Sequence, residues 1–153
     1  MPLKVVSGGQ TGVDRAALDV ARELGLPHGG WCPRGRRSEN GVIPHVYELT
    51  ETPESRYEQR TEWNVRDADA TLLLFRDELS GGTAFTLQCV RSLGRSHAAV
   101  DLGCAPDPLA LAEWIAGFRV LNVAGPRESR QPGIYEEARR YLLDLLGPGR
   151  RIS

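Results

Sequence analysis

Lysine is nearly absent from this sequence. Lys4 is its only lysine, so 18 of the 19 lysine and arginine residues are arginines. A P-loop, a Schiff-base enzyme and a pyridoxal-phosphate enzyme each need a lysine in the site. Because Lys4 stands at the amino end of the first predicted strand, these chemistries are nearly excluded. Any bound anion must therefore be held by arginine, hydroxyl or peptide N–H groups.

Long apolar runs, a strong net charge and a regular cysteine pattern are also missing. No run approaches a membrane span and no signal-peptide pattern is visible, so we expect no membrane partner. The net charge of −1 gives no electrostatic reason to bind nucleic acid. The three scattered cysteines fit a reduced cytoplasm and lack metal-ligand spacing. We expect a cytoplasmic protein that binds no metal directly.

Strands and helices alternate along the chain. Apolar runs predict strands at 3–7, 70–75, 98–102 and 119–125, with a brief one at 29–32. Helical periodicity and end signals predict helices at 12–25, 53–67, 83–94, 106–117 and 133–147. This alternation predicts an α/β fold, a Rossmann-like three-layer sandwich with helices on both faces of a mostly parallel sheet. We expect one domain over 1–147 and a loose tail over 148–153.

Three loops rich in glycine, hydroxyl or arginine side chains follow predicted strands. They are "SGGQTG" at 7–12, "LSGGT" at 79–83 and "GPRESR" at 125–130. The carboxyl ends of parallel strands meet at one edge of a sheet, so these loops should converge. Glycine lets the N–H groups at a helix N-terminus approach a phosphate closely. We predict a phosphate site lined by those N–H groups, although glycines in such turns also serve packing alone.

The candidate ligand-binding residues come from these loops and from the long segment 26–44. The first turn offers backbone, hydroxyl and charged groups at Ser7, Gly8, Gly9, Gln10, Thr11, Gly12, Asp14 and Arg15. We expect Gly81, Gly82 and Thr83 to form the second wall, and Arg127 or Arg130 to close over the anion. From segment 26–44 we include Trp31, Arg34 and Arg36.

Each candidate in segment 26–44 has two interpretations. Trp31 either stacks on a flat ring or forms a buried pair with Cys32. As a separate alternative, the Cys32 thiol would suit a soft metal. Arg34 and Arg36 either clamp a phosphate or belong to a solvated loop. On the helix before the central strand, Arg60 and Asn64 share a face, and they either contact a ligand or tie the helix to a loop.

Five blocks in order carry a family resemblance: "SGGQTGVDRAALDVA", "GGWCPRGRRSENGVIP", "YEQRTEWNVRDADATLLLF", "SGGT" and "LNVAGPRESRQPGIYEEA". Together they resemble the molybdenum-carrier family, a circularly permuted branch of the nucleotide-binding superfamily that includes the LOG proteins. The resemblance implies a Rossmann-like domain that binds a nucleotide-derived ligand or the molybdenum cofactor, molybdopterin.

These observations favour a binding or carrier protein for a phosphorylated, ring-containing small molecule. The alternative is a nucleotide hydrolase, because relatives in the wider superfamily cleave nucleoside monophosphates at a "PGGxGTxxE" turn. Here Gln88 stands near the expected glutamate, and a neutral amide cannot act as a general acid or base. Asp14 is the candidate catalytic residue, and Asp77 and Glu128 are the other carboxylates on these loops.

The last helix either packs on the sheet or supplies the face of a homo-oligomer.

Overall fold

Five strands of this chain form one sheet, in which every pair of neighbours is parallel. The computed structural model describes residues 2–147, so the predicted tail at 148–153 lies outside the described residues. The strand order is β2-β1-β9-β7-β8, with bounds β1 Lys4–Val6, β2 His28–Gly29, β7 Ala70–Phe75, β8 Ser96–Asp101 and β9 Val120–Ala124. This sheet is the middle layer of the fold.

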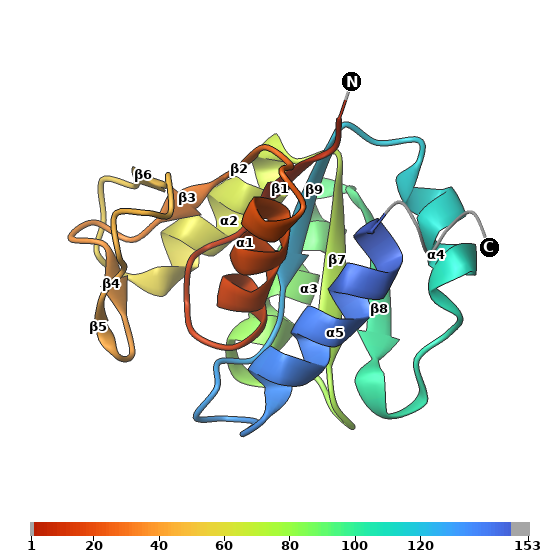
Figure 1. Ribbon diagram of the computed structural model, residues 1–153. Helices are drawn as coiled ribbons and strands as arrows, with labels where there is room; N and C mark the ends of the chain where they lie inside the picture. The colour runs from red at the N-terminus through yellow and green to blue at the C-terminus, as the bar shows by residue number, and fades with distance from the viewer. Residues whose placement is uncertain (1, 148–153) are drawn as a thin grey trace.

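Helices cover both faces of the sheet, as Figure 1 shows. One face carries α1 and α5, which pack against each other, with α4 beside α5. The other face carries α2 and α3, which also pack together. The bounds are α1 Val13–Glu23, α2 Tyr57–Asp67, α3 Gly81–Leu93, α4 Pro108–Ile115 and α5 Ile134–Leu146, with a short 3₁₀ helix at Leu102–Cys104. The prediction of a Rossmann-like sandwich is confirmed.

Burial on both faces explains the apolar character of the central strand. All six residues of β7 are buried, since helices cover it from both sides. On α1, the buried stripe includes Ala16, Ala17 and Ala21, small side chains that bring this helix close to α5. Leu142 and Leu145 of α5 are fully buried. These two leucines therefore belong to the core and are not part of an exposed face for a partner.

The long predicted loop after α1 contains short strands. β3 (Trp31–Cys32) pairs in parallel with β6 (Thr50–Glu51), and β4 (Arg37–Ser38) forms an antiparallel hairpin with β5 (Gly41–Val42).

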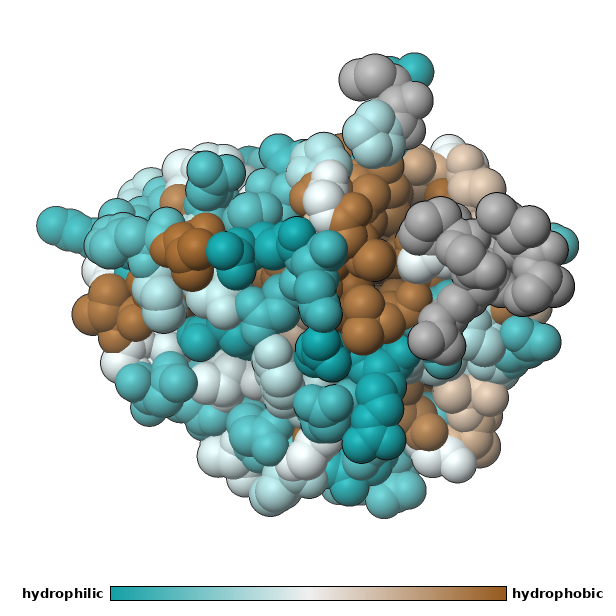
Figure 2. Space-filling view, in the orientation of Figure 1, coloured by the Kyte–Doolittle hydropathy of each residue, from teal (hydrophilic) through white to brown (hydrophobic). Residues whose placement is uncertain are grey.

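In the space-filling view of Figure 2, most of the face that carries α1 and α5 is hydrophilic. Among the described residues, no helix combines the length and apolar character that crossing a bilayer requires.

The strand order fixes where a ligand can bind. From β1 the chain steps outward to β2, and from β7 it steps outward in the opposite direction to β8, while β9 returns between β1 and β7. The carboxyl ends of β1, β9 and β7 therefore meet where the order reverses. In open α/β sheets, ligands bind in the crevice at this point.

Candidate functional site

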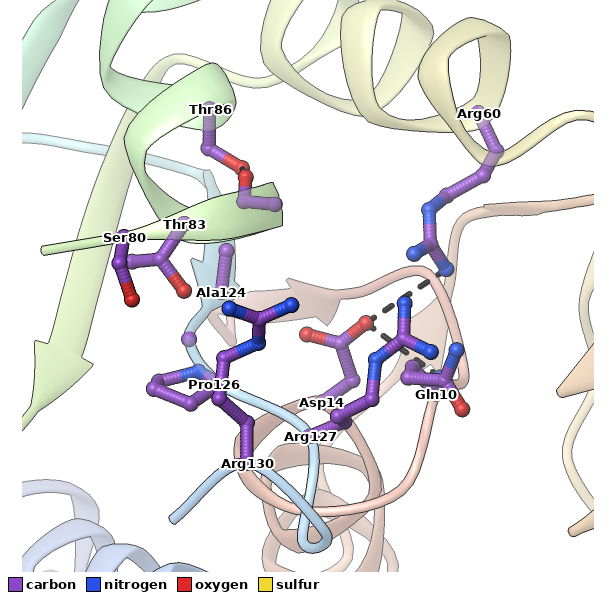
Figure 3. A pocket seen from close by; sticks show the side chains of 12 residues that line it. Gln10, Asp14, Arg60, Ser80, Thr83, Thr86, Ala124, Pro126, Arg127 and Arg130 are labelled. Carbon is purple, nitrogen blue, oxygen red and sulfur yellow. Dashed lines mark hydrogen bonds and ion pairs between the residues drawn. The ribbon is translucent and has the colours of Figure 1, made fainter. Parts of the chain in front are cut away.

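A small cavity lies at this crevice, between the loops that follow β1, β7 and β9 (Figure 3). The volume of this cavity is about 50 Å³, which suits several waters or one phosphate group but not a whole nucleotide. A larger ligand would therefore extend outward past the rim. The lining residues are Gln10, Asp14, Arg60, Ser80, Gly82, Thr83, Thr86, Ala124, Gly125, Pro126, Arg127 and Arg130.

The turn after β1 uses its own peptide N–H groups internally. The N–H of Gly9 donates to Ser7 Oγ at 3.3 Å, and that of Gln10 donates to Asp14 Oδ2 at 3.3 Å. Thr11 N–H donates to Gln10 Oε1 at 3.1 Å, and Val13 N–H donates to the Pro126 carbonyl at 3.2 Å. The prediction that N–H groups of this turn lie open to a phosphate is therefore wrong at Gly9, Gln10 and Thr11.

Close packing explains two glycines of this turn. A Cβ on Gly8 would lie 2.4 Å from Arg60 Nη1, and Arg60 donates to the Gly8 carbonyl at 2.9 Å. Gly12 has a φ of +79°, and a Cβ there would lie 2.3 Å from the Pro126 carbonyl oxygen. Both positions exclude a side chain because other parts of the protein fill the space.

The turn after β7 is arranged differently. It opens α3, whose N-cap residue Ser80 makes no capping hydrogen bond with its side chain and whose first turn carries no acidic residue. A Cβ on Gly82 would meet nothing within 4 Å. The Thr83 N–H donates to the Ser80 carbonyl at 3.2 Å, so the N–H groups left for a ligand are those that precede it. The first N–H groups of a helix carry a partial positive charge. Here the N-terminus of α3 adjoins the cavity, because Ser80, Gly82 and Thr83 line it.

Two buried polar groups that line the cavity have no hydrogen-bond partner among the residues that the structure describes. They are Gln10 Nε2 and Thr83 Oγ1, on side chains whose residues are each 3% exposed. The orientation of the Gln10 amide is fixed, because its Oε1 accepts from Thr11 N–H and from Glu39 N–H at 2.8 Å. A buried unpaired polar group costs about 1–3 kcal/mol. A ligand that bonds to both groups would recover this cost.

Three arginines make the cavity cationic. Arg60 comes from α2, and Arg127 and Arg130 come from the loop after β9. The Arg130 guanidinium lies against the start of α3, since its Cζ would be 2.9 Å from a Cβ on Gly81. No ion pair joins Arg130 to a carboxylate in the part of the chain that the structure describes. Arg130 is therefore available to an anion at the helix N-terminus.

Asp14 is the carboxylate of this cavity. It lies in the first turn of α1, and its Oδ2 is 3.7 Å from Arg60 Nη1. Burial raises the pKa of Asp14 to about 6, although the positive charges of Arg60, Arg15 and Arg127 act to lower it. Near neutral pH this group can hold or release a proton.

Glu39 ties the β4–β5 hairpin to the rim. Its carboxylate accepts hydrogen bonds from the Thr11 hydroxyl and from the Ser129 hydroxyl and N–H. Burial acts to raise the pKa of Glu39, but these hydrogen bonds and the charge of Arg127 outweigh it and lower the pKa below its ordinary value. The Thr11 hydroxyl, a predicted phosphate donor, is thus engaged within the protein.

Several other predicted residues lie outside the cavity lining. Arg36 donates to the carbonyls of 43, 44, 47 and 49, which corrects its predicted role as a phosphate clamp, because its guanidinium is occupied. Arg15 donates twice to the Gly9 carbonyl. Arg34 is exposed. Trp31 packs edge-on against Trp63 and donates from Nε1 to Asp67, beside a separate hollow.

The structure also separates the candidate catalytic groups. Glu128 accepts from the N–H groups of Gly133 and Tyr135 at the start of α5, and Asp77 lines another hollow. Gln88 faces a different cavity, between α2 and α3. Besides Gly82 and Thr83, the α3 residue that lines the site is Thr86, three positions after Thr83, and its hydroxyl donates to the Gly82 carbonyl. The sequence signal for Thr86 is its spacing from Thr83, since residues three positions apart lie on the same face of a helix.

No group of three or more His, Cys, Asp or Glu side chains that could hold a metal ion is found within residues 2–147. Cys32 is fully buried, and burial raises the pKa of its thiol. A thiol with a raised pKa is a poor metal ligand, because the thiolate is the form that coordinates. The alternative of a soft-metal role for Cys32 thus gains no support.

Comparison with known proteins places this geometry in a family. Residues 5–146 match the model of the circularly permutated YpsA SLOG family. A crystal structure from Syntrophus aciditrophicus SB, of a protein described as a candidate molybdenum carrier, is 39% identical. It aligns with a TM-score of 0.89 over 95% of this chain and 96% of that chain.

The other comparisons add little. An (E)-4-hydroxy-3-methyl-but-2-enyl diphosphate reductase aligns at 11% identity and a TM-score of 0.40, over 94% of this chain and 59% of that one, which is too weak to carry an argument. A search of curated proteins found no match. The match to the family model takes in all of the sheet except Lys4, and every residue that lines the cavity. The chain therefore belongs to the circularly permuted YpsA SLOG family.

Proposed function

We propose that this protein binds a phosphorylated, ring-containing small molecule, a nucleotide or molybdopterin, and carries it with the phosphate in the cavity at the N-terminus of α3. The observation that supports this most strongly is the pair of unpartnered buried groups, Gln10 Nε2 and Thr83 Oγ1, on one cavity with three arginines. Hydrogen-bond donors and positive charge at an uncapped helix N-terminus suit an oxyanion.

The ring of the ligand would lie outside this cavity. The enclosed space suits one phosphate group, so the remainder must leave past the rim near Arg127. The ring of Tyr57 lies beside Arg127 and Arg60, and its centroid is 5.2 Å from the guanidinium carbon of Arg127 and 5.1 Å from that of Arg60. This arrangement offers a polar and aromatic surface to the rest of the ligand.

The donor set fits the phosphate end of the molybdenum cofactor. Arginine and hydroxyl groups would hold that phosphate, and the cofactor would bring its own ligands for the metal, which matches the lack of a ligand cluster in the described residues. The description of the Syntrophus protein as a candidate molybdenum carrier supports this choice among phosphorylated ligands. A cytoplasmic location and self-association remain predictions.

Titration calorimetry with AMP and inorganic phosphate tests the proposal, together with native mass spectrometry of any ligand that copurifies. Arg130→Gln should weaken phosphate binding about tenfold or more, because a charged hydrogen bond at the helix N-terminus is lost. Arg34→Gln is the matched control, because Arg34 is exposed and outside the cavity, and it should bind like the unchanged protein. If the folded protein binds neither probe and carries no ligand, the proposal fails.

A nucleotide hydrolase is the second candidate function, and the position of Asp14 favours it. Asp14 is a carboxyl group that lines the phosphate-sized cavity, and its raised pKa of about 6 suits a general acid or base. This function would be supported if the protein releases free base from AMP and a folded Asp14→Asn variant does not. Binding of AMP without base release would leave the carrier function alone.

A further inference from the structure

We infer that Asp14 makes anion capture in this cavity proton-linked, so that an oxyanion binds only together with one proton shared between its own oxygen and the Asp14 carboxyl group. The inference rests on the proposed function, because it assumes an anion in the cavity. It adds a specificity determinant: the site would distinguish oxyanions that carry a proton from those that do not.

The first argument is geometric. Asp14 Oδ2 accepts from Gln10 N–H and faces Arg60, whereas Oδ1 accepts no hydrogen bond from any residue between 2 and 147. In Figure 3 this second oxygen points away from the dashed contacts, toward the side of the cavity on which Arg130 is drawn. An anion at the α3 N-terminus would meet a carboxylate oxygen, and two unprotonated oxyanions in contact repel each other.

The charged groups around Asp14 cannot supply the missing proton. The cations that act on it are Arg60 from α2, Arg15 from α1 and Arg127 from the loop after β9, with Arg130 across the cavity. Arginine stays protonated at any pH near neutral. α3 contributes only the hydroxyls of Ser80, Thr83 and Thr86, and neither histidine nor a second carboxylate lines the cavity. Asp14 and the anion are therefore the two groups that exchange a proton.

Burial makes this exchange feasible near neutral pH. The pKa of free Asp14 is about 6, and a bound dianion in the same cavity would raise it further. When the anion carries a proton, ionised Asp14 accepts its O–H. When the anion carries none, Asp14 must first take a proton from solvent and then donate it. Only in the second case does the affinity for the anion depend on pH. Above the pKa that Asp14 has in the protein without an anion, this affinity falls about tenfold per pH unit.

Inorganic phosphate and sulfate separate these two cases. Both are small tetrahedral oxyanions, but phosphate keeps a proton at mildly alkaline pH and sulfate has none. By calorimetry between about pH 7 and about pH 9, phosphate affinity should change less than about threefold, while sulfate affinity should fall about 100-fold. The binding enthalpy of sulfate should also vary with the ionisation enthalpy of the buffer, which reports uptake of one proton.

Two variants complete the experiment. Asp14→Asn keeps an oxygen for Gln10 N–H and gives the anion an amide donor that does not titrate, so sulfate binding should lose its pH dependence. Glu39→Gln changes a carboxylate near Arg127 that is outside the cavity lining, and it should keep the sulfate slope.

The outcomes separate the two proposals. If neither anion binds at either pH, the proposed function itself fails. If both bind with the same pH dependence, or if the sulfate slope persists in Asp14→Asn, the phosphate site stands and the proton linkage is overturned. The buffer test on the unchanged protein decides the matter even if Asp14→Asn does not fold.

Discussion

The turn after β1 uses its peptide groups to hold the protein together, whereas the turn after β7 presents a helix N-terminus to the cavity. Both contain adjacent glycines and a threonine. In the first, Gly12 meets the backbone of Pro126 and the Thr11 hydroxyl is bonded to Glu39. In the second, Gly82 faces open space and the Thr83 hydroxyl has no partner. A glycine-rich turn is a ligand site only where its surroundings leave it unfilled.

The largest expected effect comes from the matched pair Gly12→Ala and Gly82→Ala. Gly12→Ala should lower the free energy of unfolding by about 3 kcal/mol or more, because a left-handed φ and a backbone contact both oppose the methyl group. Gly82→Ala should change it by less than about 1 kcal/mol. Urea denaturation measures both. Equal losses would show that the two turns have the same role.

Gly82→Ala should instead act on binding. Gly82 lines the cavity, so the added methyl group occupies space beside the α3 N-terminus. We expect inorganic phosphate affinity to fall roughly tenfold in calorimetry. Unchanged affinity in this variant would remove the α3 N-terminus from the site.

The two threonines give a smaller but sharper contrast. Thr83→Val should leave stability unchanged or higher, because the lost hydroxyl has no partner, and should weaken phosphate binding about tenfold. Thr11→Val should lower stability by about 1–2 kcal/mol, because its hydroxyl donates to Glu39 and accepts from Glu128 N–H. Thermal denaturation and calorimetry on both variants check the pair, and a reversed pattern would exchange the roles of the turns.

The smallest expected effect is that of Gln88→Glu. The glutamate would point to the cavity between α2 and α3, away from Asp14 and the arginines. Base release from AMP should stay at its starting level. A gain of hydrolysis would mean that position 88 reaches the ligand after all.

Much of the fold could be predicted because burial leaves a direct trace in the sequence. The strand predicted at 70–75 has the observed bounds, since helices on both faces bury all six residues and five of them are apolar. The helix predicted from 53 begins at Tyr57 instead. Pro53 suits a first helical turn, but local preference does not decide where tertiary contacts let a helix begin.

The loops around the cavity could be named from the sequence, whereas their contacts could not, and the binding site itself stays a prediction. Strand ends identified the loops that converge, and Gln10, Asp14, Thr83 and Arg127 do line the cavity. The sequence did not reveal which acceptors take the N–H groups of the first turn. It also did not show that Arg36 is enclosed by four carbonyls, because such partners are distant along the chain and backbone carbonyls leave no trace in residue identity.

Backbone amide chemical shifts during a titration with inorganic phosphate test the central claim most directly. We predict that the largest changes occur at Gly81, Gly82 and Thr83, with much smaller changes at Gly9 and Thr11. Shifts concentrated at Gly9 and Thr11, with α3 unaffected, would contradict the account, because the anion would then lie on the turn that the structure fills with its own groups.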